Sequence, residues 1–311
     1  MAVPAGLCPA AGRRATNHYA AIWKGEDGLH LYAQGWEPER EPKAVVCLVH
    51  GLGDHSGRYG HVAAHLVEHG YALLAVDLRG HGRSAGPRGH AATYEALLQD
   101  IDLLLGTAAS YYPGRPRFLY GHSLGGGLVI SYALSRRPKL AGVVATSPSL
   151  RPAIEPPAWK LRLGRLLYNV RPQMQMNNGL DIEGLSHEPA VIRAYRRDPL
   201  VHDRVSARLG LDLLSNGEQA MGQADRFPLP LLLMHGNCDR LTSFAASRQF
   251  AEQAPAGICA FREWDGLYHE LHNEPQAGEV LNAITSWLDA HLVAPRRPVA
   301  HFGAHRAGGR G

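Results

Sequence analysis

The sequence is poor in cysteine, with four residues in a chain of 311. Cys8, Cys47, Cys238 and Cys259 have none of the close paired spacings that zinc sites and redox motifs require. The last three lie in or beside apolar runs, where a free thiol packs as a small hydrophobic group. We therefore expect no disulfide framework and a reducing compartment, which for this protein means the cytoplasm.

Long apolar runs are missing as well. No segment approaches the eighteen apolar residues of a membrane-spanning helix. The N-terminal stretch "MAVPAGLCPAAGRRATNHYA" lacks the apolar core of an export signal. We expect neither a transmembrane segment nor export, and nothing in the sequence specifies an oligomeric state.

Most of the chain also lacks an excess of one charge. The formal net charge is +4, but Arg296, Arg297, Arg306 and Arg310 lie in the acid-free tail 294–311. The other lysines and arginines number 28 and match the 28 acidic residues, so we expect no nucleic-acid partner. The tail is rich in glycine, proline and alanine, and we expect it and the N-terminal residues 1–14 to be flexible.

Regular alternation of apolar runs with helical stretches is what the chain does have. The runs rich in valine and leucine predict buried strands over 44–50, 71–77, 117–122, 140–147 and 230–236, and we interpret residues 259–264 as the last strand. Apolar stripes at helical spacing predict helices over 91–112, 243–254 and 277–292. This alternation favours an α/β fold with a mostly parallel, doubly wound sheet. Ahead of it, residues 28–36 alternate in polarity and predict an antiparallel edge strand.

The alternation breaks between residues 149 and 227, where prolines cluster in "RPAIEPPAWK" and no valine-rich strand occurs. We interpret residues 149–227 as a mostly helical insertion after the sixth strand, lying over the carboxyl ends of the strands. The core is then divided into a first part, 15–148, and a second part, 228–293.

The stretch "LYGHSLGGGL" contains a serine between two glycines. Ser123 follows a predicted strand and precedes a helix predicted from Leu124 to Arg136, and Gly121 and Gly125 flank it in the pattern G-x-S-x-G. In this strand-turn-helix context the serine acts as a nucleophile. The turn is so tight that side chains at the two glycine positions would collide. We therefore predict that Ser123 is the nucleophile.

A serine hydroxyl is a poor nucleophile at neutral pH and needs a histidine base that an acid orients. With this motif the acid follows a later strand, and the histidine follows the last one. Asp239 comes directly after the strand 230–236, and His269 is the first histidine after the turn at Gly266. We predict these two residues as partners of the serine. His272 lies in the same loop but nearer the next helix.

The tetrahedral intermediate of such a reaction carries a negative oxygen, which needs preorganised donors. We predict the backbone amide of Leu124, next to the nucleophile, as one donor of this oxyanion hole. The other is the amide of Leu52 in "HGLGDHSGRY", the loop after the strand 44–50. No step of this chemistry needs a metal or an organic cofactor, and we expect none.

Six motifs in a fixed order carry a family resemblance: "HGLGDHSGRY", "DLRGHGRSAG", "GHSLGGG", "DPL", "CDRLTS" and "YHELHNE". Through them, residues 15–292 resemble the monoacylglycerol lipase and lysophospholipase group of α/β-hydrolases. The resemblance implies the α/β-hydrolase fold, the same catalytic triad and oxyanion hole, and a cap formed by residues 149–227. It also implies that the glycerol end of a substrate meets polar side chains, namely Asp54, Arg58 and His272, with Tyr195 nearby in the cap.

The resemblance gives meaning to the segment "WKLRLGRLLYNV". Its apolar side chains share one helical face, and its basic residues lie elsewhere. The apolar set is Trp159, Leu163, Leu166, Leu167 and Val170, and the basic set is Lys160, Arg162 and Arg165. A basic amphipathic helix of this kind can lie on a lipid surface and admit a fatty chain, or it can merely cover the core. Peripheral membrane contact near Trp159 is thus a hypothesis.

Taken together, these features predict a serine hydrolase that cleaves esters of single-chain lipids, above all monoacylglycerols. A lysophospholipase or a short-chain carboxylesterase would use the same triad. An acyltransferase would form the same acyl-enzyme but exclude water. A non-catalytic ligand binder can have the same fold, but it has no need of a complete triad and oxyanion loop.

Overall fold

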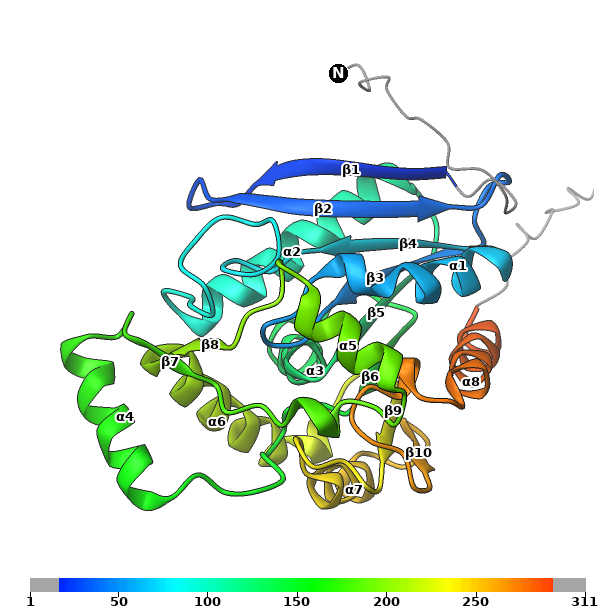
Figure 1. Cartoon of the computed structure of the whole chain (residues 1–311). Helices are drawn as coiled ribbons and strands as arrows, with labels where there is room; N and C mark the ends of the chain where they lie inside the picture. The colour runs from blue at the N-terminus through cyan, green and yellow to red at the C-terminus, as the bar shows by residue number, and fades with distance from the viewer. Residues whose placement is uncertain (1–16, 293–311) are drawn as a thin grey trace, which may run out of the picture.

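Eight strands form one sheet within residues 17–292, the part of the chain that the computed structural model describes (Figure 1). The segments predicted to be flexible, 1–14 and 294–311, lie outside it, as does Cys8. The strand order is β1-β2-β4-β3-β5-β6-β9-β10. The bounds are β1 Asn17–Lys24, β2 His30–Glu37, β3 Ala44–Val49, β4 Tyr71–Val76, β5 Arg117–His122, β6 Gly142–Thr146, β9 Leu231–Gly236 and β10 Cys259–Trp264.

Parallel pairing joins β4, β3, β5, β6, β9 and β10, which confirms the mostly parallel α/β fold expected from the alternation. The predicted edge position of residues 28–36 is wrong, because β2 pairs antiparallel with both β1 and β4. The edge strand is β1. It carries one buried side chain, that of Trp23, so its sequence lacks the apolar run by which the inner strands were recognised.

Two hydrophobic cores lie on opposite faces of the sheet, and β3 contributes to both. Val45, Cys47 and Val49 belong to one core, and the alternate residues of the strand belong to the other. The first core is covered by α2 (Tyr94–Tyr111), α3 (Leu124–Arg136) and α7 (Phe244–Gln253). The second is covered by α1 (Gly60–Glu68) and α8 (Ala277–Ala290). Helices on both faces are the doubly wound arrangement expected from the sequence.

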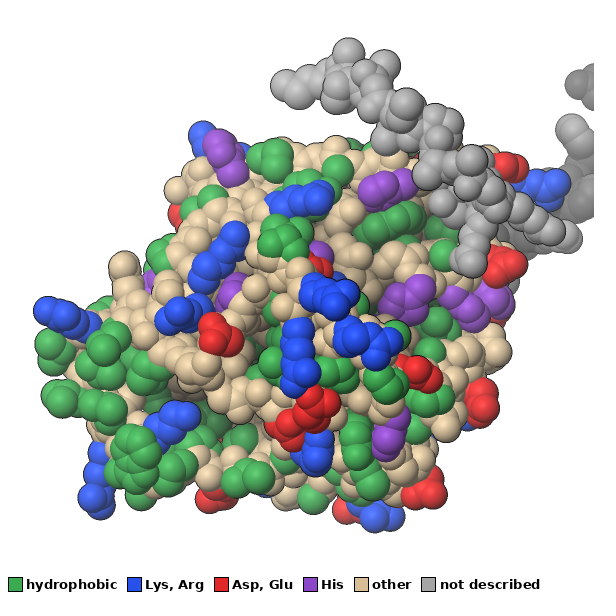
Figure 2. Space-filling model, viewed as in Figure 1, with side chains coloured by type: hydrophobic (Ala, Val, Ile, Leu, Met, Phe, Trp, Pro, Cys, Tyr) green, Lys and Arg blue, Asp and Glu red, His purple; other side chains and the backbone are tan. Residues whose placement is uncertain are grey.

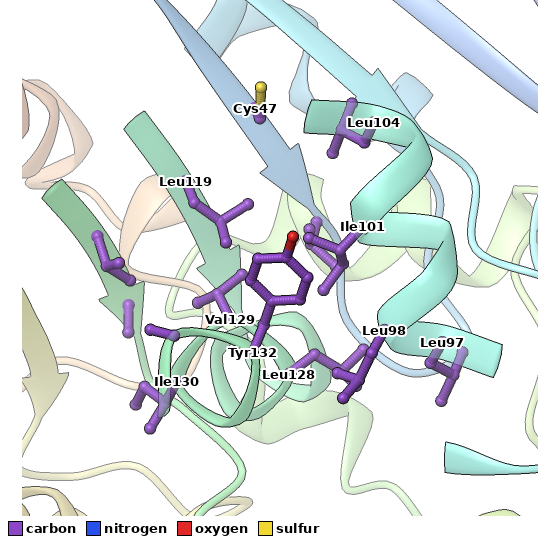
Figure 3. Close-up of a cluster of buried hydrophobic side chains, with 14 of the residues drawn as sticks. Cys47, Leu97, Leu98, Ile101, Leu104, Leu119, Leu128, Val129, Ile130 and Tyr132 are labelled. Atoms are coloured by element: carbon purple, nitrogen blue, oxygen red, sulfur yellow. The ribbon is translucent and has the colours of Figure 1, made fainter. Parts of the chain in front are cut away.

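Helix α2 packs on the sheet through the stripe that the sequence shows. Leu97, Ile101 and Leu104 are fully buried, and Figure 3 shows Ile101 pointing toward β5 and α3. The helix begins where the Thr93 hydroxyl accepts a hydrogen bond from Ala96 N at 3.1 Å, which satisfies an amide of the first turn. Helices α2 and α3 therefore share one hydrophobic core on this face of the sheet.

Between β6 and β9 the chain forms the insertion, residues 149–227. It holds three longer helices, α4 (Ala158–Val170), α5 (Pro189–Arg197) and α6 (Ala207–Met221). It also holds two paired strands of three residues each, β7 (Gln175–Asn177) and β8 (Arg204–Ser206), which are too short for a sequence pattern to reveal. Helix α6 packs on α3, and α4 packs on α6 at the outer side of the molecule (Figure 1).

Two expectations about the chemistry of the chain can be compared with the described residues. Cys47, Cys238 and Cys259 are free thiols. Between residues 17 and 292, every helix is too short or too polar to cross a membrane. The cytoplasmic location stays a prediction.

The burial of α2 leads to a stability prediction. Ile101→Ala removes a fully buried side chain from the core and leaves a cavity, so the free energy of unfolding should fall by about 2 to 5 kcal/mol. Urea denaturation monitored by circular dichroism measures this change. Ile22→Val alters an exposed side chain of β1 and should stay within about 0.5 kcal/mol of the parent. Equal effects of the two substitutions would contradict the packing described for α2.

Candidate active site

Ser123 lies in a strained turn between β5 and α3. Its backbone has φ 55° and ψ −117°, a region that costs a residue other than glycine about 1 to 3 kcal/mol. A Cβ atom on Gly121 would overlap the carbonyl oxygen of Gly125. A Cβ atom on Gly125 would overlap the carbonyl oxygen of Val49 at the end of β3. Both glycines are therefore required for the close approach of strand and helix, as the sequence argument held.

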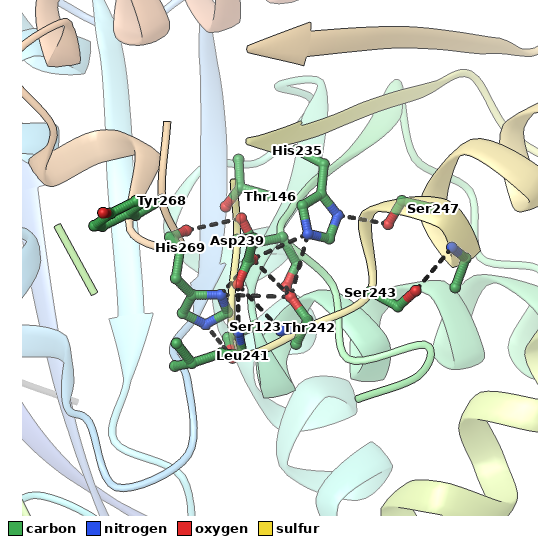
Figure 4. Close-up of polar contacts among 12 residues, drawn as sticks. Ser123, Thr146, His235, Asp239, Leu241, Thr242, Ser243, Ser247, Tyr268 and His269 are labelled. Atoms are coloured by element: carbon green, nitrogen blue, oxygen red, sulfur yellow. Dashed lines mark hydrogen bonds and ion pairs between the residues drawn. The ribbon is translucent and has the colours of Figure 1, made fainter. Parts of the chain in front are cut away.

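The structure brings the three predicted triad residues together (Figure 4). His269 Nε2 lies 2.9 Å from Ser123 Oγ, and His269 Nδ1 lies 2.7 Å from Asp239 Oδ2. Asp239 follows β9, and His269 follows β10, so all three side chains meet at the carboxyl ends of parallel strands. The distances suit proton transfer from the serine hydroxyl to the imidazole.

Further groups hold the Asp239 carboxylate in place. Oδ1 accepts hydrogen bonds from the backbone amides of Leu241 and Thr242, at 2.7 and 3.1 Å. Oδ2 lies 2.9 Å from Thr242 Oγ1 and 3.0 Å from His235 Nε2, and the other ring nitrogen of His235 lies 2.7 Å from Ser247 Oγ. The sequence reasoning missed His235. Its one signal is a polar residue near the end of the apolar run "LLLMHG".

Electrostatics favour a charged imidazole at this site. Burial opposes protonation of His269, but the Asp239 carboxylate and its hydrogen bond outweigh burial and raise the pKa of His269. Burial likewise works against ionisation of Asp239. The His269 and His235 rings outweigh it and hold the pKa of this carboxyl well below its usual value. Asp239 therefore stays ionised and can stabilise the imidazolium that forms when Ser123 gives up its proton.

The predicted oxyanion donors lie beside the serine. Leu124 is the first residue of α3, so its amide has no acceptor within the helix and lies at the positive end of the helix dipole. A Cβ atom on Gly51 would lie 3.3 Å from Ser123 Cβ, which shows how closely the loop after β3 approaches the nucleophile. Leu52 follows in that loop. Donation by the Leu52 and Leu124 amides stays a prediction, which this placement supports.

A cavity of about 300 Å³ opens at the serine. Ser123, Leu52 and Leu124 line it from the core, and the insertion lines it mainly with apolar side chains such as Leu161 of α4 and Leu211 of α6. A cavity of this size and lining suits an apolar ligand that presents one polar group to the serine.

The four residues predicted to meet glycerol lie elsewhere, and the lining of this cavity includes none of Asp54, Arg58, Tyr195 and His272. Asp54 and Tyr195 are buried, and both contact Arg58, whose side chain is 10% exposed. His272 stacks on the Tyr59 ring at 4.9 Å, and its ring nitrogens have no hydrogen-bond partner within residues 17–292. Burial among other histidines and Arg58 holds the pKa of His272 well below its ordinary value. Contact of these four residues with glycerol stays a prediction.

A serine at a strand-to-helix turn of a doubly wound sheet, with its acid and histidine following in that chain order, defines an α/β-hydrolase. Residues 40–276 match the family described as "Serine aminopeptidase, S33". The chain belongs to this family, within the monoacylglycerol lipase-like α/β-hydrolases, and the resemblance found in the motifs is confirmed.

Three relatives illustrate this membership. The chain is 34% identical to a monoacylglycerol lipase of Mycolicibacterium smegmatis over 86% of its own length and 96% of that protein. It is 37% identical to the crystal structure of a Paleococcus ferrophilus monoacylglycerol lipase, with a TM-score of 0.76 over 88% of this chain and 99% of that one. An uncharacterised abhydrolase domain-containing protein of Dictyostelium discoideum is 39% identical over 84% of this chain, but the chain spans 28% of its length.

The pairing of Asp239 with His269 predicts a pH dependence. Protonated His269 cannot accept the serine proton, so kcat/KM should fall as the pH drops through the pKa of His269, above the ordinary 6.5. Asp239→Asn removes the charge that raises this pKa. The midpoint of the pH profile of kcat/KM should move to lower pH, and kcat should drop by about 10⁴-fold. Hydrolysis of a p-nitrophenyl ester across the titration range of histidine measures both effects.

The matched control for this experiment is Asp225→Asn, which changes an exposed aspartate that precedes β9. Its midpoint and rate should equal those of the parent. A midpoint that is unchanged in Asp239→Asn would contradict the role of this carboxylate.

Proposed function

We propose that the protein hydrolyses monoacylglycerols to glycerol and free fatty acid through an acyl-enzyme on Ser123. One observation carries the proposal: Ser123 Oγ lies 2.9 Å from His269 Nε2 and lines an apolar cavity of about 300 Å³. The named lipases among the relatives support the glyceride as substrate, since they match this chain over nearly their whole length.

In the first half of the reaction, Ser123 Oγ attacks the ester carbonyl carbon, and His269 Nε2 takes the hydroxyl proton. The carbonyl oxygen becomes negative and accepts hydrogen bonds from the amides of Leu52 and Leu124. The tetrahedral intermediate then collapses. The bond from carbon to the glycerol oxygen breaks, His269 gives its proton to that oxygen, and glycerol leaves while the acyl group stays on Ser123.

In the second half, water takes the place of glycerol. His269 accepts a proton from the water as its oxygen attacks the acyl carbon, and the same two amides stabilise the oxyanion. When this intermediate collapses, the bond to Ser123 Oγ breaks and the proton returns to the serine. The fatty acid is released, and Ser123 and His269 regain their starting states.

We further propose that the insertion, residues 149–227, serves as a cap between the two core parts, 15–148 and 228–293. It supplies apolar cavity-lining side chains such as Leu161, Leu180 and Leu211. A saturated acyl chain has no hydrogen-bonding group, so it gains free energy of transfer in such a lining, about 0.8 kcal/mol for each buried CH₂.

Helix α4 of this cap is proposed to dock on a lipid surface. Trp159 and Val170 are each 67% exposed and Leu166 is 60% exposed, an unusual exposure for large apolar side chains. Figure 2 shows hydrophobic side chains gathered over α4, with basic side chains beside them. The bases of this helix, Lys160, Arg162 and Arg165, suit anionic headgroups. A lipid surface is also where monoacylglycerols reside.

Chemical labelling tests the nucleophile. The parent should react with a fluorophosphonate probe and hydrolyse 1-decanoylglycerol, and Ser123→Ala should lose both activities because it removes the hydroxyl that lies 2.9 Å from His269 Nε2. Ser135→Ala, which changes an exposed serine of α3 outside the cavity lining, should keep both. Labelling of Ser123→Ala at the parental rate would refute the proposed nucleophile.

Substrate choice separates the remaining functions. Parallel assays with decanoyl lysophosphatidylcholine and p-nitrophenyl decanoate keep the acyl chain and change the alcohol. Preference for the lysophospholipid would replace the monoacylglycerol lipase proposal with a lysophospholipase. Ester products that form when another alcohol is added, without free fatty acid, would indicate an acyltransferase.

Vesicle binding tests the role of α4. Trp159 and Leu163 lie on this helix outside the cavity lining, so the double variant Trp159→Ser/Leu163→Ser should spare the cavity. Its binding to vesicles of phosphatidylcholine and phosphatidylglycerol should weaken at least tenfold, since burial of each side chain contributes about 1.5 to 3 kcal/mol. The control is Ile22→Ser, which replaces an exposed apolar side chain of β1 in the same way. This variant should bind the vesicles as the parent does. Parental binding by the double variant would rule out docking through α4.

A further inference from the structure

Arg58 joins two carboxylates that come from distant parts of the chain. Its Nη1 donates to Asp54 Oδ1 at 3.0 Å and to Glu270 Oε1 at 2.8 Å, and its Nη2 donates to Glu270 Oε2 at 2.8 Å. The face of the guanidinium lies 4.9 Å from the centre of the Tyr195 ring. The planar fork of arginine is matched to both oxygens of Glu270, which lysine could not reproduce.

This cluster is removed from water. The side chains of Arg58, Asp54 and Glu270 are 10%, 5% and 3% exposed. Although burial disfavours its charge, Asp54 has a pKa held well below the usual value, because the Arg58 guanidinium lies beside it. Without that cation, the two buried carboxylates would lie close together with no positive charge between them. Removing one partner of a buried ion pair is strongly unfavourable for this reason.

The three partners of Arg58 lie in three segments that serve the reaction. Asp54 lies in the loop that carries the Leu52 amide. Glu270 is the residue after His269, and Tyr195 belongs to α5 of the insertion. Arg58 thus connects the loop of the oxyanion donor, the loop of the base and the insertion.

Besides the contact of His269 with Ser123, the loop of the base is attached to the first core part through His61 of α1, whose Nε2 lies 2.8 Å from the carbonyl oxygen of His272. The His269 and Glu270 amides donate to the carbonyl oxygens of Gly184 and Leu185 in the insertion, at 3.4 and 2.8 Å. The carbonyl oxygen of His269 accepts from Ser147 Oγ at 2.7 Å. On the Glu270 side chain, Asn273 of the same loop adds one bond at 2.7 Å. The tie from Glu270 to the oxyanion loop is therefore made by Arg58.

We propose that Arg58 is a positioning residue, which holds the loop of His269 against the oxyanion loop by binding Glu270 and Asp54 together. It then acts on every ester, whatever the alcohol, and does not recognise glycerol. The proposal rests on the proposed function of Ser123 as nucleophile. Two features favour it over direct contact with substrate: both terminal nitrogens of Arg58 are engaged by protein carboxylates, and Arg58 is not among the residues that line the cavity.

Two esters with the same acyl chain distinguish positioning from glycerol recognition. On both 1-decanoylglycerol and p-nitrophenyl decanoate, Arg58→Met should lower kcat by roughly 10²-fold, the effect of misplacing a reacting group by about 1 Å, with little change in KM. Fluorophosphonate labelling of Ser123 should slow by the same factor. A raised KM on the glyceride alone, with normal hydrolysis of the p-nitrophenyl ester, would overturn the proposal.

A second-site change tests whether unpaired charge causes the loss. Glu270→Gln removes one of the two carboxylates that Arg58→Met leaves facing each other. The double variant Arg58→Met/Glu270→Gln should therefore react several-fold faster than Arg58→Met on both esters. Arg58→Lys keeps the charge without the fork and should fall between the parent and Arg58→Met. A double variant slower than Arg58→Met by the full effect of Glu270→Gln alone would count against the proposal, because Arg58→Met already breaks the contact with Glu270.

The matched control is Arg136→Met, which removes an arginine paired with Glu95 at the far end of α3 and should keep parental kcat. Melting curves identify variants that fail to fold. If Arg58→Met does not fold, Glu270→Gln alone decides: its kcat should fall roughly tenfold on both esters, and parental kcat would overturn the proposal.

The parent enzyme keeps the two proposals apart. A parent that cleaves the p-nitrophenyl ester but not the glyceride would refute the monoacylglycerol substrate, and the p-nitrophenyl ester would still decide the role of Arg58. A parent whose Ser123 does not react with the probe would refute both.

Discussion

The close approach of α3 to the end of β3 is the constraint on which the site depends. Because Gly125 has no side chain, the first turn of α3 lies directly against the carbonyl oxygen of Val49. At that spacing Ser123 has its positive φ of 55°, and its Cβ atom lies beside Gly51 of the loop after β3. The nucleophile, the first amide of the helix and the loop after β3 are therefore one rigid arrangement, held from below by the core that α2 and α3 share.

Much of this fold could be predicted because buried parallel strands and their covering helices leave strong patterns. The apolar runs of β3 to β6 and β9 and the apolar stripe of α2 could be recognised in the sequence because their side chains are buried. The pattern failed where burial is slight or the element is short. Strand β1 has one buried side chain, and β7 and β8 have three residues each. These strands form because they pair with segments elsewhere in the chain, and the pairing leaves no pattern in their own sequences.

In the candidate site too, some residues could be predicted from the sequence and others could not. Ser123, Asp239 and His269 could be chosen because each follows a recognisable strand, and the structure brings them within hydrogen-bonding distance. The side chains that support them could not. His235 is one polar residue in an apolar strand, and Glu270 meets Arg58 across 212 positions of sequence. Such contacts arise from loop conformation and leave no periodic pattern in the sequence, so the two carboxylates that bind Arg58 could not be predicted.

The separation of 146 positions between Ser123 and His269 has a consequence for synthesis. A ribosome therefore makes the nucleophile 146 residues before its base. Until β10 joins the sheet and delivers His269, the serine is an ordinary alcohol with no group to take its proton. The nascent chain can therefore expose its strained turn among cellular esters without reacting, and esterase chemistry begins when the last strand is in place.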